Sequence, residues 1–132
     1  MKDPNNPCLF CNINDRDVIF NNRYAYASFD SYPVSKFHSL IFTKRHVKNF
    51  FDLSEDELLA CNDLIKKVRN KIIIEDVSVK GFNIGTNAGK VAGQSIFHCH
   101  IHVIPRRESD VDNPQGGVRG VIPLKQHYIR KK

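Results

Sequence analysis

Three histidines alternate with other residues in the segment FHCHIHV, residues 97–103. Side chains of a β-strand alternate between its two faces, so a strand here would place His98, His100 and His102 on one face. Neighbouring imidazoles would lie about 6–7 Å apart, which lets the three surround a single small ligand. The opposite face is uniformly apolar and consists of Phe97, Cys99, Ile101 and Val103.

Two kinds of chemistry fit these histidines. A neutral imidazole is a common zinc ligand, and it can also attack phosphorus and form a covalent intermediate. An ordinary polar strand face is the third interpretation. We favour a functional site, because half of the six histidines of the chain alternate along this one segment.

The loop before the histidines is suited to an anion. Residues 87–95, NAGKVAGQS, contain two glycines that let backbone N–H groups approach a phosphate closely. Loops of this composition are often simple turns, so the loop supports a phosphate site only together with the histidines.

Two of the four cysteines, Cys8 and Cys11, have a spacing that is typical of metal ligands. A redox pair and two incidental cysteines are the alternatives. Cys61 and Cys99 fall at apolar positions and are expected to be buried, inert thiols. No secretion signal is apparent, so reduced thiols or a metal site are favoured over disulfides.

The elements around these residues indicate an α+β fold. Strands are expected over residues 24–29, 38–43, 81–86 and 96–104, with Pro105 ending the last one. A helix should begin after Leu53, where Ser54 and Glu57 form a capping box, and should end near residues 73–74. Its apolar face is predicted to contain Leu58, Cys61, Ile65, Val68 and Ile72. Strands before and after one long helix predict an antiparallel sheet.

Length and composition indicate one globular domain over residues 1–132, with an N-terminal Cys-x-x-Cys segment at 1–17 and an irregular tail at 107–132. No apolar run approaches the roughly 18 residues that span a bilayer, and residues 1–7 are polar. We therefore expect a cytoplasmic protein that does not enter a membrane.

The chain carries a formal charge of +6, which favours polyanionic ligands. A zinc-stabilised nucleic-acid binder is one reading of this charge and the cysteine pair. The basic residues are dispersed, however, and no nucleic-acid motif is apparent, so nucleic acid is not the expected partner.

Residues 93–106, GQSIFHCHIHVIPR, resemble the signature of the histidine triad (HIT) family, in which H-x-H-x-H follows Gly-Gln-Ser or Gly-Gln-Thr. Phe29-Asp30, HSLI at 38–41 and KRH at 44–46 resemble the first half of that family. The matches cover residues 8–106, and the tail from Asp110 resembles hydrolase-type bacterial members such as diadenosine polyphosphate hydrolases. The resemblance implies a sheet of about five strands, one long amphipathic helix and a short helix.

The resemblance also implies roles for the polar residues. His100 would be the nucleophile, His102 would bind a phosphate oxygen, and His38 would support the nucleophile from the neighbouring strand. If Nδ1 of His100 donates to a backbone carbonyl, its Nε2 keeps the attacking lone pair. Asp30 would accept hydrogen bonds from ribose hydroxyls. A structural histidine and a turn-forming aspartate remain the alternatives for His38 and Asp30.

Further substrate contacts are implied in the glycine-containing loop and in the first half of the chain. The phosphate and leaving-group positions of the family fall on Asn87, Gly93, Gln94 and Ser95. Ile19, Phe20 and Phe29 are candidates for a base pocket, or they belong to the core. Some members also bind a structural zinc ion, which plays no part in phosphorus chemistry. Its four ligands would be Cys8, Cys11, His46 and His98, and no catalytic metal is expected.

The activity implied by the resemblance is hydrolysis or transfer at the α-phosphate of dinucleoside polyphosphates or related nucleotides, through a covalent nucleotidyl-histidine. A purine nucleoside phosphoramidase and a nucleotide-binding module with little turnover are the alternatives. Members are usually homodimers with a sheet that continues across the interface. The helix that begins near Ser54 would contribute to such an interface.

Overall fold

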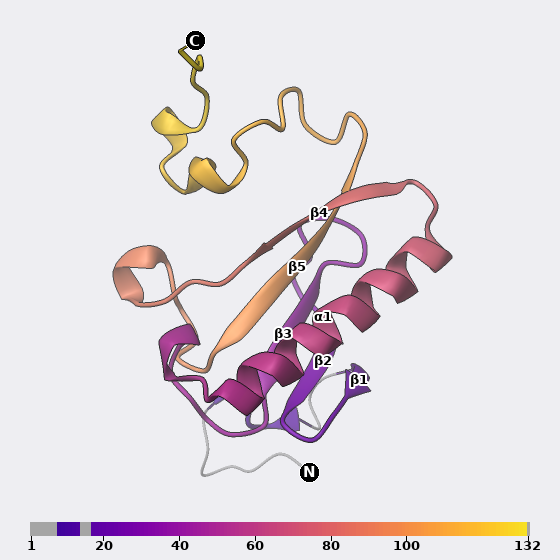
Figure 1. Ribbon diagram of the computed structural model, residues 1–132, viewed down its shortest axis with the longest axis vertical. Helices are drawn as coiled ribbons and strands as arrows, with labels where there is room; N and C mark the ends of the chain where they lie inside the picture. The colour runs from indigo at the N-terminus through magenta and orange to yellow at the C-terminus, as the bar shows by residue number, and fades with distance from the viewer. Residues whose placement is uncertain (1–7, 14–16, 132) are drawn as a thin grey trace.

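A five-stranded antiparallel sheet forms the centre of the computed structural model, which describes residues 8–13 and 17–131. The strands are β1 (Val18–Asn21), β2 (Ala25–Phe29), β3 (Ser39–Thr43), β4 (Val79–Gly85) and β5 (His100–Arg107). They lie in the order β1-β2-β3-β5-β4. One long helix, α1 (Glu55–Glu75), lies across one face of the sheet (Figure 1). The predicted α+β class and antiparallel sheet are confirmed.

Helix α1 begins where the capping box predicts. The Ser54 side chain accepts from the backbone N–H of Glu57, and the Glu57 side chain accepts from the backbone N–H of Ser54. The buried positions of the helix are Glu57, Cys61, Leu64, Val68 and Ile72. Leu58, predicted on the buried face, is 42% exposed, and Leu64 is fully buried. The face that meets the sheet is therefore rotated away from Leu58 and toward Leu64.

The two faces of the sheet carry different side chains at its centre. In the pairing of β3 with β5, Ile41 lies opposite Ile101, and both belong to the core beneath α1. The alternate residues point to the other face, where Phe42 lies opposite His100. On that second face Phe42 packs against Phe10 from the N-terminal segment. The alternation along β5 thus separates a core face from a polar face, as the pattern predicts.

The strands differ from the prediction chiefly at β1 and β5. β1 was not expected, because it is a short edge strand with an irregularity in its pairing to β2. β5 begins at His100 rather than Ile96 and continues past Pro105 to Arg107. Pro105 is tolerated because the pairing of β5 with β3 ends at Val103, which leaves β4 as the neighbour beyond that point.

The chain after β5 leaves the sheet and forms two 3₁₀ helices, η4 (Val118–Val121) and η5 (Pro123–Lys125). Figure 1 shows this tail extending beyond one end of the sheet. Two further short turns, η2 (Phe50–Asp52) and η3 (Lys90–Ala92), are also 3₁₀ helices. Among the described residues α1 is therefore the α-helix, and the additional short helices are of the 3₁₀ type.

No helix of the described residues combines the length and apolar character needed to cross a membrane. The polar stretch 1–7 lies outside the described residues.

Candidate functional site

A cavity of about 510 Å³ lies on the sheet face opposite α1. β5 contributes His100 and His102 to it, and the segment before β3 contributes His38. The remaining polar lining consists of Asp30, Ser31, Tyr32, Asn87 and Ser95. The structure therefore brings the predicted nucleophile, its neighbouring histidines and part of the glycine-containing loop around one space.

The tautomer of His100 follows from its backbone contact. Its Nδ1 lies 2.8 Å from the carbonyl oxygen of His98. A carbonyl only accepts hydrogen bonds, so Nδ1 carries the proton and Nε2 keeps its lone pair. The ring is 9% exposed and packs against Phe10, with the two ring centroids 4.8 Å apart. His100 is thus a nearly buried imidazole that is held as the tautomer required for attack through Nε2.

The tautomers of His38 and His102 follow from a chain of hydrogen bonds. The backbone N–H of Val34 donates to Nδ1 of His38 over 3.1 Å, so the His38 proton lies on Nε2. That Nε2 is 2.9 Å from Nδ1 of His102 and donates to it. Nδ1 of His102 therefore accepts, and its Nε2 carries a proton. In their neutral forms, His38 orients His102 so that it offers an N–H donor.

The contacts of His38 involve His102 and Asp30. Its ring packs against His102, with the centroids 5.1 Å apart, and its Nε2 also lies 3.4 Å from Oδ2 of Asp30. The ring of His100 packs against His102 and Phe10. His38 is thus connected to His100 by way of His102.

Asp30, His38 and His102 bring three potential metal-binding atoms close together. The hydrogen bonds argue against a metal ion there. Nδ1 of His38 already uses its lone pair for the Val34 N–H, so a metal on Nε2 would require an imidazolate. The cluster is better described as a hydrogen-bonded relay.

Asp30 forms a turn and also lines the cavity, so both interpretations of this residue agree with the structure. Its Oδ1 accepts from the backbone N–H of Tyr32 over 2.8 Å, which is the turn-forming contact. Its Oδ2 faces His38, and the residue lines the cavity. A carboxylate can make the turn with one oxygen and still present the other to a ligand.

Burial lowers the pKa of both His38 and His102 below the ordinary value of 6.5. For His102 the neighbouring His100 and His38 lower the pKa further, whereas Asp30 acts to raise the pKa of both rings. Both imidazoles are therefore neutral near pH 7, which is the state that the hydrogen-bond chain requires.

Replacing Asp30 by asparagine is expected to lower the pKa of His38 and of His102 further, because the carboxylate that favours their charged forms is removed. NMR titration of the imidazole C–H signals measures this directly. In the unsubstituted protein, acidification below 6.5 should lower the free energy of unfolding, since the unfolded histidines bind protons before the folded ones do. A rise of either pKa in Asp30→Asn would contradict the assignment.

The glycine-containing loop is shaped by two glycines, Gly89 and Gly93, with φ angles of 99° and 95° that favour glycine. Asn87, Gly93 and Ser95 line the cavity as expected. Gln94 does not. Its side chain is 3% exposed, accepts from the N–H of Gly89, and donates to the carbonyls of Lys48 and Ile96.

The amide group of Gln94 makes its hydrogen bonds to backbone groups, because a buried amide must satisfy both its oxygen and its nitrogen. Gln94 fixes the shape of the loop, and the loop then presents its other residues to the cavity.

The candidate base pocket also differs from the expectation. Ile19 and Phe20 pack against the core beneath α1, and the Phe29 ring lies 5.7 Å from that of Phe37. The apolar lining of the cavity instead consists of Leu9, Phe10, Val34, Leu40 and Ile96. Leu9 and Phe10 were missed, although their place between the two cysteines was a signal: a metal site that holds the cysteines also holds the residues between them.

A second constellation lies beside the cavity. Sγ of Cys8 and Cys11 and Nδ1 of His46 and His98 all lie within 4.8 Å of one another. Three S···N separations are 3.2, 3.3 and 3.5 Å, and the two Nδ1 atoms are 3.2 Å apart. Tetrahedral zinc with ordinary bond lengths requires about 3.5 Å between S and N ligands and about 3.3 Å between two N ligands. The donor set fits zinc in type, number and spacing.

His98 lies just before β5, and its ring packs on the same side of the sheet as His100, with its centroid 5.7 Å from that of Phe10 and 6.3 Å from that of Phe42. Residues 96–99 are not part of the strand, and the backbone N–H of Cys99 is bonded to the carbonyl of Val47. The His98 ring is fully buried, and its Nε2 lies 2.7 Å from the carbonyl oxygen of Thr43. Nε2 therefore carries the proton, and Nδ1 faces the two cysteines. Phe97, expected in the core, is 39% exposed.

None of the four cysteines forms a disulfide bond. Burial raises the pKa of Cys61 to about 12 and that of Cys99 to about 11. These two thiols are buried, as expected, and are unreactive at neutral pH.

Comparison with known proteins places these observations in context. A family model described as the HIT domain matches residues 12–109. An uncharacterized HIT-like protein of Methanocaldococcus jannaschii is 36% identical over 108 residues, which cover 78% of this chain and 81% of that protein. The adenosine 5'-monophosphoramidase of Schizosaccharomyces pombe is 31% identical over 103 residues, covering 75% of this chain and 74% of that protein.

The solved structures agree with this result. The crystal structure of a hypothetical histidine triad nucleotide-binding protein from Sulfolobus tokodaii has a TM-score of 0.72 and 34% identity. The likeness covers 78% of this chain and 71% of that one.

Proposed function

Because this chain belongs to the HIT family, whose domain model matches residues 12–109, we propose that it cleaves nucleotides at the α-phosphate through a covalent nucleotidyl-His100. Nucleotide hydrolysis in general is supported by the relative that is named an adenosine 5'-monophosphoramidase. The observation that carries the proposal is the contact of His100 Nδ1 with the carbonyl of His98. This contact leaves the lone pair on Nε2, and His100 lines the cavity of about 510 Å³.

The reaction proceeds in two displacements at phosphorus. Nε2 of His100 forms a bond to the α-phosphorus, and the bond to the leaving group breaks with its electron pair. The proton stays on Nδ1 and is donated in a hydrogen bond to the His98 carbonyl, which stabilises the positive charge on the ring. A water molecule then attacks the same phosphorus, loses a proton and releases the nucleotide together with free His100.

The other histidines would act on the phosphate rather than on the nucleophile. The Nε2–H of His102 donates to a non-bridging phosphate oxygen, where negative charge increases during attack. His38 keeps His102 in the required tautomer through the 2.9 Å contact. His38 is therefore a positioning residue.

The rest of the cavity fits the parts of a nucleotide. The second oxygen of Asp30 would accept from the ribose hydroxyls, and the backbone and side chains of Asn87, Gly93 and Ser95 would contact the phosphates. The base would lie against Leu9, Phe10 and Ile96 instead of the residues first considered.

The leaving group distinguishes two related activities. The tail from Asp110 resembles the hydrolase branch, which favours dinucleoside polyphosphates as substrates. The similarity to a relative named as a phosphoramidase supports the alternative, in which the leaving group is joined through nitrogen. A binding module with little turnover is less well supported, because the histidine that would carry the covalent intermediate is present and has the required tautomer.

The test is hydrolysis in ¹⁸O-labelled water, with diadenosine tetraphosphate and adenosine phosphoramidate supplied separately. AMP carrying one ¹⁸O atom is the expected product, because water attacks the α-phosphorus. The better substrate identifies the leaving group. Label found only in the leaving group, or no AMP from either compound while nucleotide still binds, would contradict the proposal.

A structural zinc ion at Cys8, Cys11, His46 and His98 is part of the proposal. Bound there, zinc would supply a cross-link between the N-terminal segment and the segment that leads into β5. It would take no part in the phosphorus chemistry, which is assigned to His100.

A homodimer is also proposed. β4 lies at one edge of the sheet, and an apolar cavity beside it is lined by residues of α1, β4 and β5 that include Leu58, Ile65 and Ile84. Leu58 and Ile84 are 42% and 51% exposed. Pairing of two β4 edges would cover these side chains and continue the sheet.

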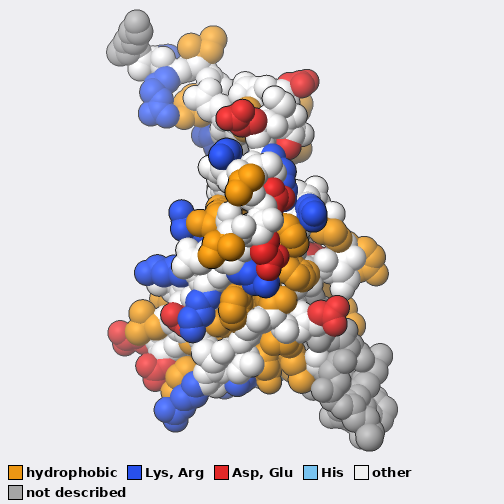
Figure 2. All heavy atoms as spheres, turned by 90° about the vertical axis from the view of Figure 1, so that its right-hand side faces the viewer, with side chains coloured by type: hydrophobic (Ala, Val, Ile, Leu, Met, Phe, Trp, Pro, Cys, Tyr) orange, Lys and Arg blue, Asp and Glu red, His pale blue; other side chains and the backbone are white. Residues whose placement is uncertain are grey.

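Nucleic acid remains an unfavoured partner. On the face drawn in Figure 2, the Lys and Arg side chains are interspersed with acidic and apolar side chains rather than gathered into one basic surface. A dispersed charge of this kind favours solubility and general attraction of anions over a nucleic-acid interface.

A further inference from the structure

The turn that follows β3 carries two contacts of the Cys/His constellation. The carbonyl of Thr43 accepts the Nε2–H of His98 over 2.7 Å, which directs Nδ1 of His98 toward the cysteines. The Thr43 hydroxyl donates to the carbonyl of Arg45 over 2.8 Å and so closes the turn. His46 is the next residue, and its Nδ1 lies 3.2 Å from Sγ of Cys11. The positions of both histidine ligands therefore depend on this one turn.

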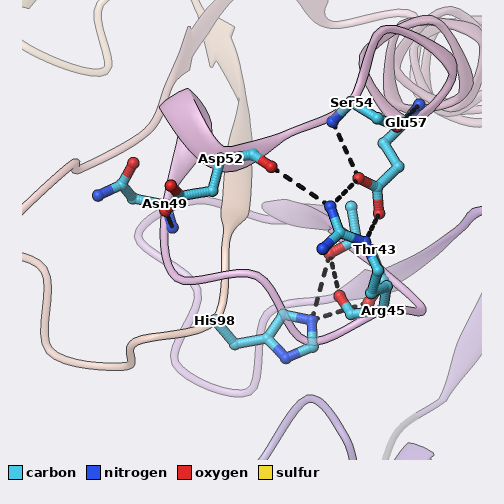
Figure 3. Close-up of polar contacts among 7 residues, drawn as sticks. All are labelled: Thr43, Arg45, Asn49, Asp52, Ser54, Glu57 and His98. Atoms are coloured by element: carbon cyan, nitrogen blue, oxygen red, sulfur yellow. Dashed lines mark hydrogen bonds and ion pairs between the residues drawn. The ribbon is translucent and has the colours of Figure 1, made fainter.

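A buried carboxylate holds the turn from the side of α1 (Figure 3). The two oxygens of Glu57 lie 2.6 Å and 3.2 Å from NH2 and Nε of Arg45, so the ion pair is bidentate. The same guanidinium donates to the carbonyl of Asp52 over 3.3 Å. Figure 3 shows the Arg45 side chain between the start of the helix and the turn that contacts His98.

Glu57 is more than a helix cap. The glutamate of a capping box needs to reach only the backbone N–H of the cap residue, which Glu57 does over 2.9 Å at Ser54. Its side chain is nevertheless only 3% exposed, whereas that of Arg45 is 60% exposed. A buried charge is unfavourable unless it is fully paired, so the ion pair fixes Arg45 at one position relative to the helix.

Glu57 is charged under ordinary conditions. Burial acts to raise the pKa of its carboxyl group, but the hydrogen bonds from Arg45 and Ser54 outweigh burial, and the pKa lies below its usual value. The ion pair is thus present over the whole neutral range.

We propose that the Glu57–Arg45 ion pair is a positioning device for zinc: it fixes the turn from Thr43 to His46, and the turn in turn sets His98 and His46 as ligands. The proposal rests on the zinc site proposed above. Neither Glu57 nor Arg45 touches the metal position, and both act through the turn. The helix start and the metal ligands would accordingly be coupled.

Glu57→Gln tests the coupling by measuring zinc affinity in competition with a coloured chelator. Glutamine still serves a capping box, but it loses the charge and one of the two acceptor oxygens that Arg45 uses. The expected result is a 10- to 100-fold weaker affinity for zinc, roughly the effect of removing an outer contact of a metal ligand. Arg45→Lys, at an exposed position, is the second variant, and the loss of the planar fork should weaken zinc binding in the same direction.

Ser54→Ala is the matched control, because it removes the other half of the same capping box and leaves the Arg45 ion pair in place. It should lower the thermal midpoint while the zinc affinity stays within about twofold of the unsubstituted protein. If Ser54→Ala weakens zinc binding as much as Glu57→Gln does, Glu57 acts only through helix stability and the proposal is wrong. Unchanged zinc affinity in both Glu57→Gln and Arg45→Lys also overturns it.

The unsubstituted protein separates this inference from the zinc site itself. If it binds no zinc, the zinc site and the positioning role fail together. If it binds zinc and the Glu57 and Arg45 variants bind equally well, only the positioning role fails.

Discussion

His100→Ala is expected to lower kcat by at least about 10³-fold while nucleotide affinity changes only a few-fold. The substitution removes the Nε2 lone pair that would attack phosphorus. It leaves Asp30, the loop and the apolar lining, which would provide most of the binding. Steady-state release of AMP gives kcat, and calorimetric titration with AMP gives the affinity.

The neighbouring histidine provides the control for this prediction. His102→Ala removes a phosphate contact but leaves the nucleophile, so its loss of kcat should be smaller, about 10²-fold. His100→Gly leaves room for a free imidazole, and added imidazole should partly restore turnover. Turnover of His100→Ala close to that of the unsubstituted protein would show that another group attacks phosphorus.

The covalent intermediate can be observed separately. A nucleotidyl group on imidazole nitrogen is labile in acid and more stable in alkali, so protein quenched in alkali with a radiolabelled substrate should retain label on His100. Peptide mapping locates the label. Label on a different residue would reassign the nucleophile while leaving the cavity as the site.

The alternation of side chains along β5 predicted that His100 and His102 share one face, and both line the cavity. They lie opposite Phe42 and Leu40 on that face, and Ile101 lies opposite Ile41 on the other. His98 precedes the strand, and its ring also packs against Phe10 and Phe42 on the predicted side, but its surroundings could not be read from the alternation. Residues 96–99 bend before the strand begins, through contacts with residues about fifty positions away in the sequence.

Local signals also predicted the start of α1, where Ser54 and Glu57 make both halves of the capping box. The ion pair of Glu57 with Arg45 was not predictable, because it depends on how the turn after β3 packs against the helix. The tautomers of His100 and His38 depend in the same way on hydrogen bonds to the backbone. Sequence patterns indicate which residues are available for chemistry, but tertiary packing determines their protonation and direction.

Gln94 illustrates the limit of transferring a role by position. Its place in the loop matched a phosphate contact, yet its amide joins Gly89, Lys48 and Ile96. The side chain is buried, and a buried amide is satisfied by the nearest backbone groups. A sequence alone does not show whether a loop residue contacts the substrate or only fixes the shape of the loop.

Removal of zinc is expected to have the second large effect. The protein as purified should contain one zinc ion per chain, and Cys8→Ser with Cys11→Ser should contain none. With free zinc at about 100 times the dissociation constant, binding stabilises the fold by about 2.7 kcal/mol, so a strong chelator should lower the thermal midpoint by roughly 10 °C. Elemental analysis and calorimetry measure the two quantities.

Cys61→Ala is the control for the zinc prediction, because it also removes a cysteine from the chain but one on the buried face of α1, which is not among the four ligands. It should keep one zinc ion per chain even though the loss of a buried side chain lowers its stability. Zinc retained at full occupancy in the Cys8 and Cys11 double variant would rule out the site.

Zinc removal should also lower kcat, although no zinc ligand would touch the substrate. His98 connects the two sites: its ring faces the cysteines, and its carbonyl accepts the Nδ1–H of His100. Without the metal, the backbone of His98 is held less firmly, and a smaller fraction of His100 has its Nε2 lone pair directed at the cavity.

Because the loss concerns orientation and not binding, kcat should fall while KM stays nearly constant, and restoring zinc should restore kcat. A chelated protein with full activity and a lowered thermal midpoint would show instead that the metal stabilises the fold without positioning the nucleophile.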